Sequence, residues 1–247
     1  FIDGDMEIIP DFLALVYNIE KNKLIYPFIS GQYINYYYNQ KGEIINKENY
    51  HKSILKKDNY KVEVGGLFLI EKFIWESVGG IKNKYKRSQD IDLSLRLAKK
   101  KLKLLRKKDI LAIHHTINYR DKKRMWNMLR EKSELYGRSV LYRDHIFNMH
   151  VYPIIFKNDY SLIILVISCF ISILLLNAGY LIIYILIAVL RAIKSRKKLN
   201  NSFFNYFTYF TLRDIIVLIG LFTFYPSSNK RIIYNEIWKA NKRCFLL

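Results

Sequence analysis

The feature that most constrains this chain is a run of thirty residues without a single charge, residues 161–190. One straight helix of that length would measure about 45 Å, whereas the hydrocarbon core of a bilayer is about 30 Å thick. Asn177, Ala178 and Gly179 form a turn signal near the middle of the run. We therefore predict a hairpin of two short, tightly connected membrane helices and prefer it to one long tilted span.

The charges around this run indicate its orientation. A net charge of +20 suits either nucleic acid or an anionic membrane surface, and the uncharged run argues against a nucleic-acid binder. Basic clusters lie at residues 99–108, 120–132 and 191–198. Because Lys and Arg collect on the cytoplasmic side of membrane proteins, a hairpin returns residues 191–198 to the side of the N-terminal part. We predict a multi-pass protein of the cell membrane whose N-terminal part faces the cytoplasm.

A second apolar stretch, residues 203–225, contains Arg213 and Asp214 and leaves an unbroken run of only eleven residues, 215–225. Such a run is too short to span a bilayer. We predict an interfacial or re-entrant segment in which Arg213 and Asp214 are paired or reach the headgroups. A third full span is the alternative.

The N-terminal part has the mixed composition of a soluble α/β segment. The pattern predicts a helix from Pro10 to near Lys21, and strands at residues 24–29 and 110–118. Residues 30–64 show little periodicity and are predicted to be a long surface excursion. The predicted divisions are a catalytic portion at 1–118, an interfacial helical region at 119–157, membrane segments at 158–226 and a basic tail at 227–247.

Residues 121–143 mix apolar, aromatic and basic side chains in a helical pattern. Aromatic side chains beside many cations suit the headgroup layer, so we predict an interfacial helix. A helix packed on the rest of the protein is the alternative. Cys169 and Cys244 provide neither a disulfide framework nor zinc-ligand spacing, which is compatible with a reducing compartment.

Two acidic pairs are the strongest chemical signals. Asp3 and Asp5 follow an apolar strand end, and their spacing lets both carboxylates reach one hard cation that holds a diphosphate. Ser88 is a plausible N-cap, which places Asp90 and Asp92 in the first turn of a helix. The positive end of the helix dipole keeps such carboxylates ionised, and an ionised Asp at a pocket rim can accept a proton from a sugar hydroxyl.

Two glycine pairs lie between these acidic pairs. Gly65 and Gly66 allow the backbone to approach a ligand closely, or allow a positive φ where a strand begins. Gly79 and Gly80 follow a predicted short helix at residues 71–77 and are expected to end it.

These motifs resemble those of family 2 glycosyltransferases with a GT-A fold. FIDGD resembles the DxD motif of that family, and GG…VGG…QDIDLSLRL resembles its acceptor-side block. The resemblance covers roughly residues 1–120, and the second block is the more specific part because it is long and ordered. Gln89 stands where the family usually has a Glu beside the aspartate that acts as base. The implied fold class is α/β, an incomplete GT-A (Rossmann-like) domain followed by α-helical membrane segments.

The resemblance also implies roles for single residues. Asp90 is the expected catalytic base, and the expected cofactor is a divalent cation, Mn²⁺ or Mg²⁺. The implied metal ligands are Asp3, Asp5 and His114, with His115 as the substitute. The implied residues around the nucleotide-diphosphate sugar donor are Asp3, Asp5, Gly65, Gly66, Gln89 and Asp92.

The expected function is therefore that of a membrane-associated, metal-dependent, inverting glycosyltransferase. It would move a sugar from a nucleotide-sugar donor to a lipid-linked or cell-surface saccharide. In the family, residues before the DxD motif bind the nucleotide, and we expect a longer chain or another polypeptide to supply them. The alternative is a catalytically incomplete, transferase-like membrane protein that acts as an assembly partner.

Overall fold

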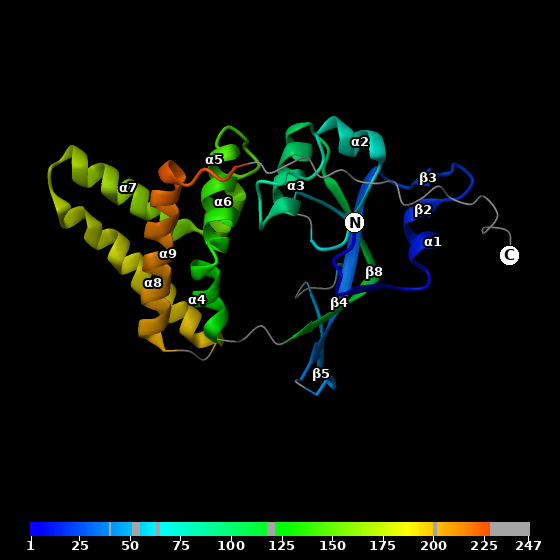
Figure 1. Cartoon of the computed structure of the whole chain (residues 1–247), viewed down its shortest axis with the longest axis horizontal. Coiled ribbons are helices and arrows are strands. Elements are labelled where there is room, and N and C mark those ends of the chain that lie inside the picture. The colour runs from blue at the N-terminus through cyan, green and yellow to red at the C-terminus, as the bar shows by residue number, and fades with distance from the viewer. Residues whose placement is uncertain (40, 51–54, 63–64, 118–121, 200–201, 228–247) are drawn as a thin grey trace.

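The computed structural model describes residues 1–227 apart from residues 40, 51–54, 63–64, 118–121 and 200–201. It consists of a mixed α/β part built around a sheet and a group of helices beside that sheet (Figure 1). The predicted basic tail lies outside the described residues from residue 228 onwards.

The main sheet has six strands among the described residues, and the pairing is mixed. Its central strands, β4 and β8, are parallel, and every other pair is antiparallel. The strand order is β1-β8-β4-β5, with β6 beside β8 and β7 beside β4. The strands are β1 (Met6–Ile8), β4 (Phe28–Tyr38), β5 (Ile44–Asn49), β6 (Asn59–Lys61), β7 (Leu69–Ile70) and β8 (Leu104–Ile117). A separate hairpin is formed by β2 (Tyr17–Asn18) and β3 (Lys23–Leu24).

The prediction of a long surface excursion at residues 30–64 is wrong, because β4 continues through the centre of the sheet to Tyr38. The first half of β4 is buried continuously, so it lacks the alternation that reveals a half-exposed strand. Its buried polar groups are satisfied, as when Ser30 Oγ donates to the carbonyl of Leu67 at 2.6 Å. Gly31 is required there, since a Cβ on it would overlap the side chain of Leu111.

Helices cover both faces of the sheet. Helix α3 (Gln89–Lys99) places Leu93 and Leu97 in a core with Phe28, Phe68 and Leu104. Helix α1 (Phe12–Val16) packs in a second core with Ile29, Tyr33, Leu67, Leu111 and Ala112. Removing these apolar side chains from water stabilises the two layers on the sheet.

Two helix ends differ in how well the pattern predicted them. Gly79 and Gly80 follow α2 (Lys72–Ser77) with φ of 75° and 62°, as expected of a glycine stop. By contrast, α1 ends at Val16, well before Lys21, because the chain turns into β2 and β3.

The helical part contains α4 (Lys122–Arg130), a π-helical turn η1 (Leu135–Val140), α5 (Leu141–Asp144), α6 (Tyr152–Asn158), α7 (Tyr160–Leu174), a 3₁₀ turn η2 (Ala178–Tyr180), α8 (Leu181–Leu199) and α9 (Phe203–Thr223). The helix predicted at residues 121–143 is therefore broken, with Lys132 at a φ of 59° between α4 and η1. Trp126 Nε1 donates to Asn205 Oδ1 at 2.8 Å, and Ser139 Oγ donates to the carbonyl of Val217 at 2.9 Å. These contacts fit the alternative in which the region packs on other helices.

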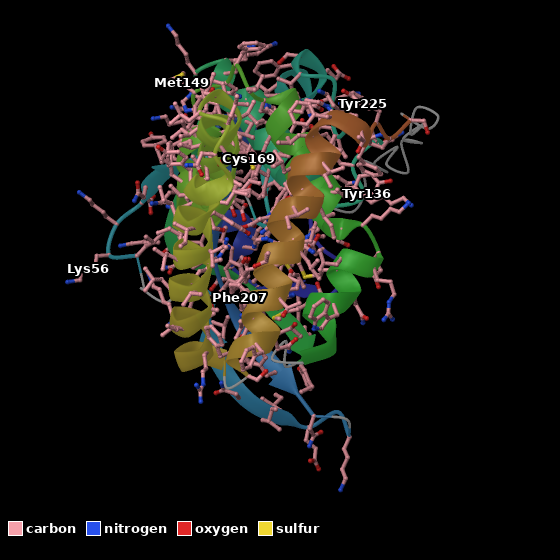
Figure 2. All side chains as sticks on the ribbon, turned by 90° about the vertical axis from the view of Figure 1, so that its left-hand side faces the viewer. Lys56, Tyr136, Met149, Cys169, Phe207 and Tyr225 are labelled. Carbon is pink, nitrogen blue, oxygen red and sulfur yellow. The ribbon has the colours of Figure 1, made fainter. Side chains whose placement is uncertain are left out.

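The hairpin predicted for residues 161–190 is confirmed as a structural unit. Helices α7 and α8 pack side by side, and the Asn177 side chain accepts a hydrogen bond from the Gly179 amide at 2.8 Å in the turn between them. Leu176, at the tip, is 94% exposed. Figure 2 views the molecule from this side, with the apolar helices in front of the sheet.

Two helical segments of the described chain are long and apolar enough to cross a membrane, Ala178–Arg196 and Phe203–Thr223. A third span is counted if α6 and α7, which meet at a bend of 96°, are taken as one. The prediction of an interfacial or re-entrant segment rests on the premise that only residues 215–225 are unbroken. This premise is wrong, because α9 runs through Arg213 and Asp214 as one helix of membrane length, which fits the alternative of a third span. Both side chains are buried on its inner side and pair with each other at 2.7 Å, as predicted.

Candidate functional site

The N-terminal segment brings Asp3 against the first glycine pair. The Asp3 amide donates to the carbonyl of Gly66 at 2.9 Å. A Cβ on Gly66 would overlap the Asp3 carboxylate, and a Cβ on Gly65 would lie 3.0 Å from the Tyr33 hydroxyl. Neither glycine is among the residues with positive φ. The two glycines therefore let other groups lie close to the backbone, and these groups are the side chains of Asp3 and Tyr33.

Asp5 and His114 meet at the edge of the sheet where β1 pairs with β8. His114 Nε2 lies 3.1 Å from Asp5 Oδ2, and the other ring nitrogen, Nδ1, lies 2.8 Å from Asn35 Oδ1. If Nδ1 carries the proton and donates to the Asn35 carbonyl, Nε2 directs its lone pair towards the same space as the Asp5 carboxylate. Metal-binding histidines are commonly oriented in this way by a carbonyl on their second nitrogen.

His115 points to the opposite face of the sheet. Its Nδ1 lies 2.6 Å from the Tyr38 hydroxyl and its Nε2 lies 3.1 Å from Glu7 Oε2. Because successive residues of a strand face opposite sides, only one of the two histidines can accompany Asp5. The structure selects His114.

The three implied metal ligands do not converge fully. Among the residues that the structure describes, no group of three or more His, Cys, Asp or Glu side chains is arranged to hold a metal ion. Asp5 and His114 are in contact, whereas Asp3 interacts with them only through charge. Burial raises the pKa of Asp3 and the Asp5 charge raises it further, while His114 opposes this shift.

Asp90 lies in the first turn of α3, as predicted. Burial raises the pKa of its carboxyl above the usual value, and the negative charge of Asp3 raises it further. Hydrogen bonds from the backbone amides of Ile91 and Asp90, together with the charge of Arg87, act in the opposite direction. The first turn of α3 therefore places Asp90 within electrostatic reach of Asp3, although the two residues are far apart in the sequence.

The residues that flank Asp90 depart from expectation. Ser88 occupies the N-cap position, but it has a left-handed φ of 63° and its side chain makes no capping bond. Gln89 donates from Nε2 to the carbonyl of Tyr85 at 2.6 Å. The Gln89 side chain thus fixes the turn before α3.

Asp92 is directed into the protein, and its carboxylate has no exposed surface. Arg96 holds Oδ2 with two hydrogen bonds, from Nε at 3.0 Å and from Nη2 at 2.7 Å. His145 Nε2 lies 2.9 Å from Oδ1. Binding a donor through Asp92 would require these partners to be displaced.

The spacing of Asp90 and Asp92 in the sequence already indicated that their side chains point in different directions. Residues two apart on a helix are separated by about 200° around its axis, so they face opposite sides. The other functional candidates that the sequence did not reveal are Asn35 and His145. Asn35 lay in the presumed surface excursion, and His145 lies 53 residues from its partner Asp92.

Taken together, the site contains a carboxylate–imidazole pair, Asp5 and His114, and a partly buried carboxylate on a helix N-terminus, Asp90. The first pair can bind a cation, and the second can accept a proton. Comparison with known proteins gives no match to a family model, to a curated protein or to a solved structure.

Proposed function

We propose that residues 1–118 form the catalytic portion of a GT-A (Rossmann-like) domain in a membrane-associated, inverting glycosyltransferase. The observation that carries this proposal is the contact of Asp5 with His114 at 3.1 Å, together with the electrostatic interaction that links Asp90 to Asp3 and Asp3 to that pair. Both halves of the chemistry, an anchor for a diphosphate and a base for a hydroxyl, thus belong to one region. The mixed sheet and the membrane-length helices are compatible with this assignment.

In the proposed reaction, Asp90 takes the proton from an acceptor hydroxyl. The hydroxyl oxygen forms a bond to the anomeric carbon of the donor sugar while the bond from that carbon to the diphosphate oxygen breaks on the opposite side. The configuration at the anomeric carbon is inverted, and the diphosphate leaves with its electron pair. General-base assistance of this kind contributes about 100- to 10,000-fold to the rate.

Asp5 and His114 would hold Mn²⁺ or Mg²⁺, and Asn35 would orient the imidazole. Such a cation neutralises charge on a departing diphosphate. The donor set fits this task, because an imidazole nitrogen and a carboxylate oxygen suit Mn²⁺ and the carboxylate also suits Mg²⁺. Asp3 lies close enough to contribute charge.

The acceptor class follows from the position of the helices. The catalytic portion adjoins apolar helices of membrane length, which places it beside a bilayer in our proposal. A lipid-linked or cell-surface saccharide is the acceptor that such a location offers. Mn²⁺-dependent sugar transfer by the full-length protein tests the proposal, and a donor-binding chain without turnover would favour an assembly partner.

A first prediction concerns the cation. Asp5→Ala, and more mildly His114→Ala, should raise the Mn²⁺ concentration for half-maximal activity by about 10- to 100-fold, the range seen when the surroundings of metal ligands are altered. The matched controls are Glu7→Ala and His115→Ala, which remove the equivalent pair on the other face of the sheet. Unchanged Mn²⁺ dependence in both test variants removes Asp5 and His114 from the coordination shell.

A second prediction concerns topology. Single cysteines at positions 121, 177 and 195, in a background without Cys169 and Cys244, can be labelled in intact cells with a membrane-impermeant maleimide. We expect positions 121 and 195 to be protected until lysis and position 177 to react, since export of the basic residues at 191–198 opposes the charge bias. Labelling of position 195 from outside, with position 121 protected until lysis, would show one long span and overturn the hairpin.

A further inference from the structure

The C-terminal end of α5 and the turn that follows it contact α3 and the turn before α3 at three points. The Tyr85 hydroxyl, just before α3, donates to Asp144 Oδ2 at 2.6 Å. His145 Nε2 lies 2.9 Å from Asp92 Oδ1, and Asn148 Nδ2 donates to the carbonyl of Leu95 at 2.8 Å. Residues 144–148, which lie 53 to 59 positions after their partners in the sequence, therefore hold α3 from the side opposite Asp90.

The contact between His145 and Asp92 is the most enclosed of the three. The Asp92 side chain has no exposed surface and the His145 side chain is 6% exposed. Burial acts to raise the pKa of Asp92, but the hydrogen bond from His145 and the charge of Arg96 outweigh it and lower that pKa. A buried carboxylate that loses a partner is strongly destabilised, so this pair fixes the two elements relative to each other.

The imidazole itself is oriented by Asn148. Asn148 Nδ2 lies 3.4 Å from His145 Nδ1, which assigns Nδ1 as the acceptor and leaves the proton on Nε2, facing Asp92. The backbone amide of Asn148 also donates to the backbone carbonyl of His145 at 2.8 Å, which closes the turn. One tautomer of His145, with the proton on Nε2, thus satisfies both neighbours.

The same segment is held on its other side by α9. Arg143 Nη1 donates to the carbonyls of Leu221 at 3.1 Å and Phe224 at 3.0 Å, at the C-terminal end of that helix. Gly220 permits the close approach, because a Cβ there would overlap Leu135 and Ser139. Residues 135–148 therefore form a bridge between a helix of membrane length and the helix that carries Asp90.

We propose that His145 is a positioning residue for the glycosyl transfer proposed above, on which this inference rests. Through Asp92 it sets the orientation of the first turn of α3, and thereby the direction of the Asp90 carboxylate two residues earlier. His145 touches neither donor nor acceptor in this role. A misplacement of about 1 Å at a reacting group can cost about 100-fold in rate, so a loosened first turn lowers kcat.

The kinetic test compares three variants of the full-length membrane protein. His145→Ala should lower kcat by about 10- to 100-fold and leave the donor KM unchanged, because Asp5 and His114 are not disturbed. His145→Gln keeps an N–H donor near the position of Nε2 and should recover most of the rate. His150→Ala, a half-buried histidine on the same loop, is the matched control and should behave as wild type.

A second readout does not depend on turnover. Amide hydrogen exchange over residues 89–92 should be faster in His145→Ala than in wild type, and normal in His145→Gln and His150→Ala. Unchanged exchange there, a Gln variant as impaired as the Ala variant, or a rise in donor KM equal to the loss in kcat would overturn the positioning role. An absence of transfer by wild type would instead refute the proposed function, and exchange would still decide the role of His145.

Discussion

Asp90→Asn lowers the rate of sugar transfer by about 100- to 10,000-fold in the full-length protein, with donor and Mn²⁺ affinities close to those of wild type. The reason is that the amide keeps the shape and the hydrogen bonds to the α3 backbone but cannot take a proton. Single-turnover rates and donor binding by calorimetry measure the two quantities separately. A loss of donor affinity as large as the loss of rate would reassign Asp90 to binding.

The pH dependence provides a second check on Asp90. A general base acts only when it is deprotonated, and burial raises the pKa of this carboxyl above its ordinary value of 3.8. Transfer by wild type should therefore fall as the pH drops through that raised pKa, with an acid limb above 3.8. Such a limb is expected to vanish from the residual activity of Asp90→Asn.

The same shift has a consequence for stability. A carboxyl whose folded-state pKa is raised stabilises the fold fully below its unfolded-state pKa, and that contribution is lost as the pH rises through the folded-state pKa. At neutral pH the ionised Asp90 thus lowers the free energy of unfolding. Asp90→Asn should have a melting temperature at pH 7 equal to or above that of wild type, while its activity is largely lost. A lower melting temperature would mean that the carboxylate stabilises the turn.

Asp159→Ala is the variant with the largest expected effect on stability, a loss of about 3–5 kcal/mol. Asp159 precedes α7 and is 0% exposed. Arg138 donates to its two oxygens from Nε at 3.0 and 2.9 Å, and Arg213 Nη2 lies 2.9 Å from Oδ1. Removing the carboxylate leaves these guanidinium groups buried with too little negative charge around them.

The surroundings of Asp159 explain why the loss is large. Three arginines and three acids form one buried ion cluster that joins η1, α7, α8 and α9, namely Arg138, Arg191, Arg213, Glu134, Asp159 and Asp214. The three positive and three negative charges balance, and removing any single one leaves an unbalanced charge in the cluster. These buried charges hold the helices together because the loss of one partner leaves another charge buried and unpaired.

Thermal unfolding in detergent micelles, followed by far-UV circular dichroism, measures the effect. A loss of this size lowers the melting temperature of a chain of this length by roughly 6–20 °C. Asp11→Ala, an exposed aspartate, is the control. Arg213→Met added to Asp159→Ala restores charge balance, so the double variant should lose less than the sum of the single variants. An Asp159→Ala melting temperature equal to that of the control would contradict the structural role of the cluster.

Local composition predicted the membrane-like hairpin correctly. The uncharged run, its length against the thickness of a bilayer, and the turn at Asn177 are all properties of neighbouring residues. An apolar helix bonds its backbone groups within itself, whatever lies beside it. The glycine stop after α2 and the acidic first turn of α3 were predicted for the same reason, since a helix end depends on a few adjacent residues.

The sequence failed where burial came from distant elements. Strand β4 lacks alternation because helices cover both of its faces, so its polar residues suggested a surface loop. Arg213 and Asp214 suggested a break in α9, but Arg191 in α8 pairs with Asp214, and Asp159 before α7 pairs with Arg213. A charged pair interrupts an apolar helix only if no partners reach it, and the partners lie outside any local window.

For the site, local sequence patterns were enough to identify the candidate residues: two aspartates after the first strand end, an aspartate at a helix N-terminus, and two adjacent histidines. The tertiary structure decided which of them meet. Alternation along β8 turns His114 and His115 to opposite faces, where they meet Asp5 and Glu7, and helical rotation sends Asp90 outwards and Asp92 into the interior against His145. The physical reason is that the spacing of residues in a strand or helix fixes which side chains share a face. Which face points towards the site depends on the distant elements with which that strand or helix is buried.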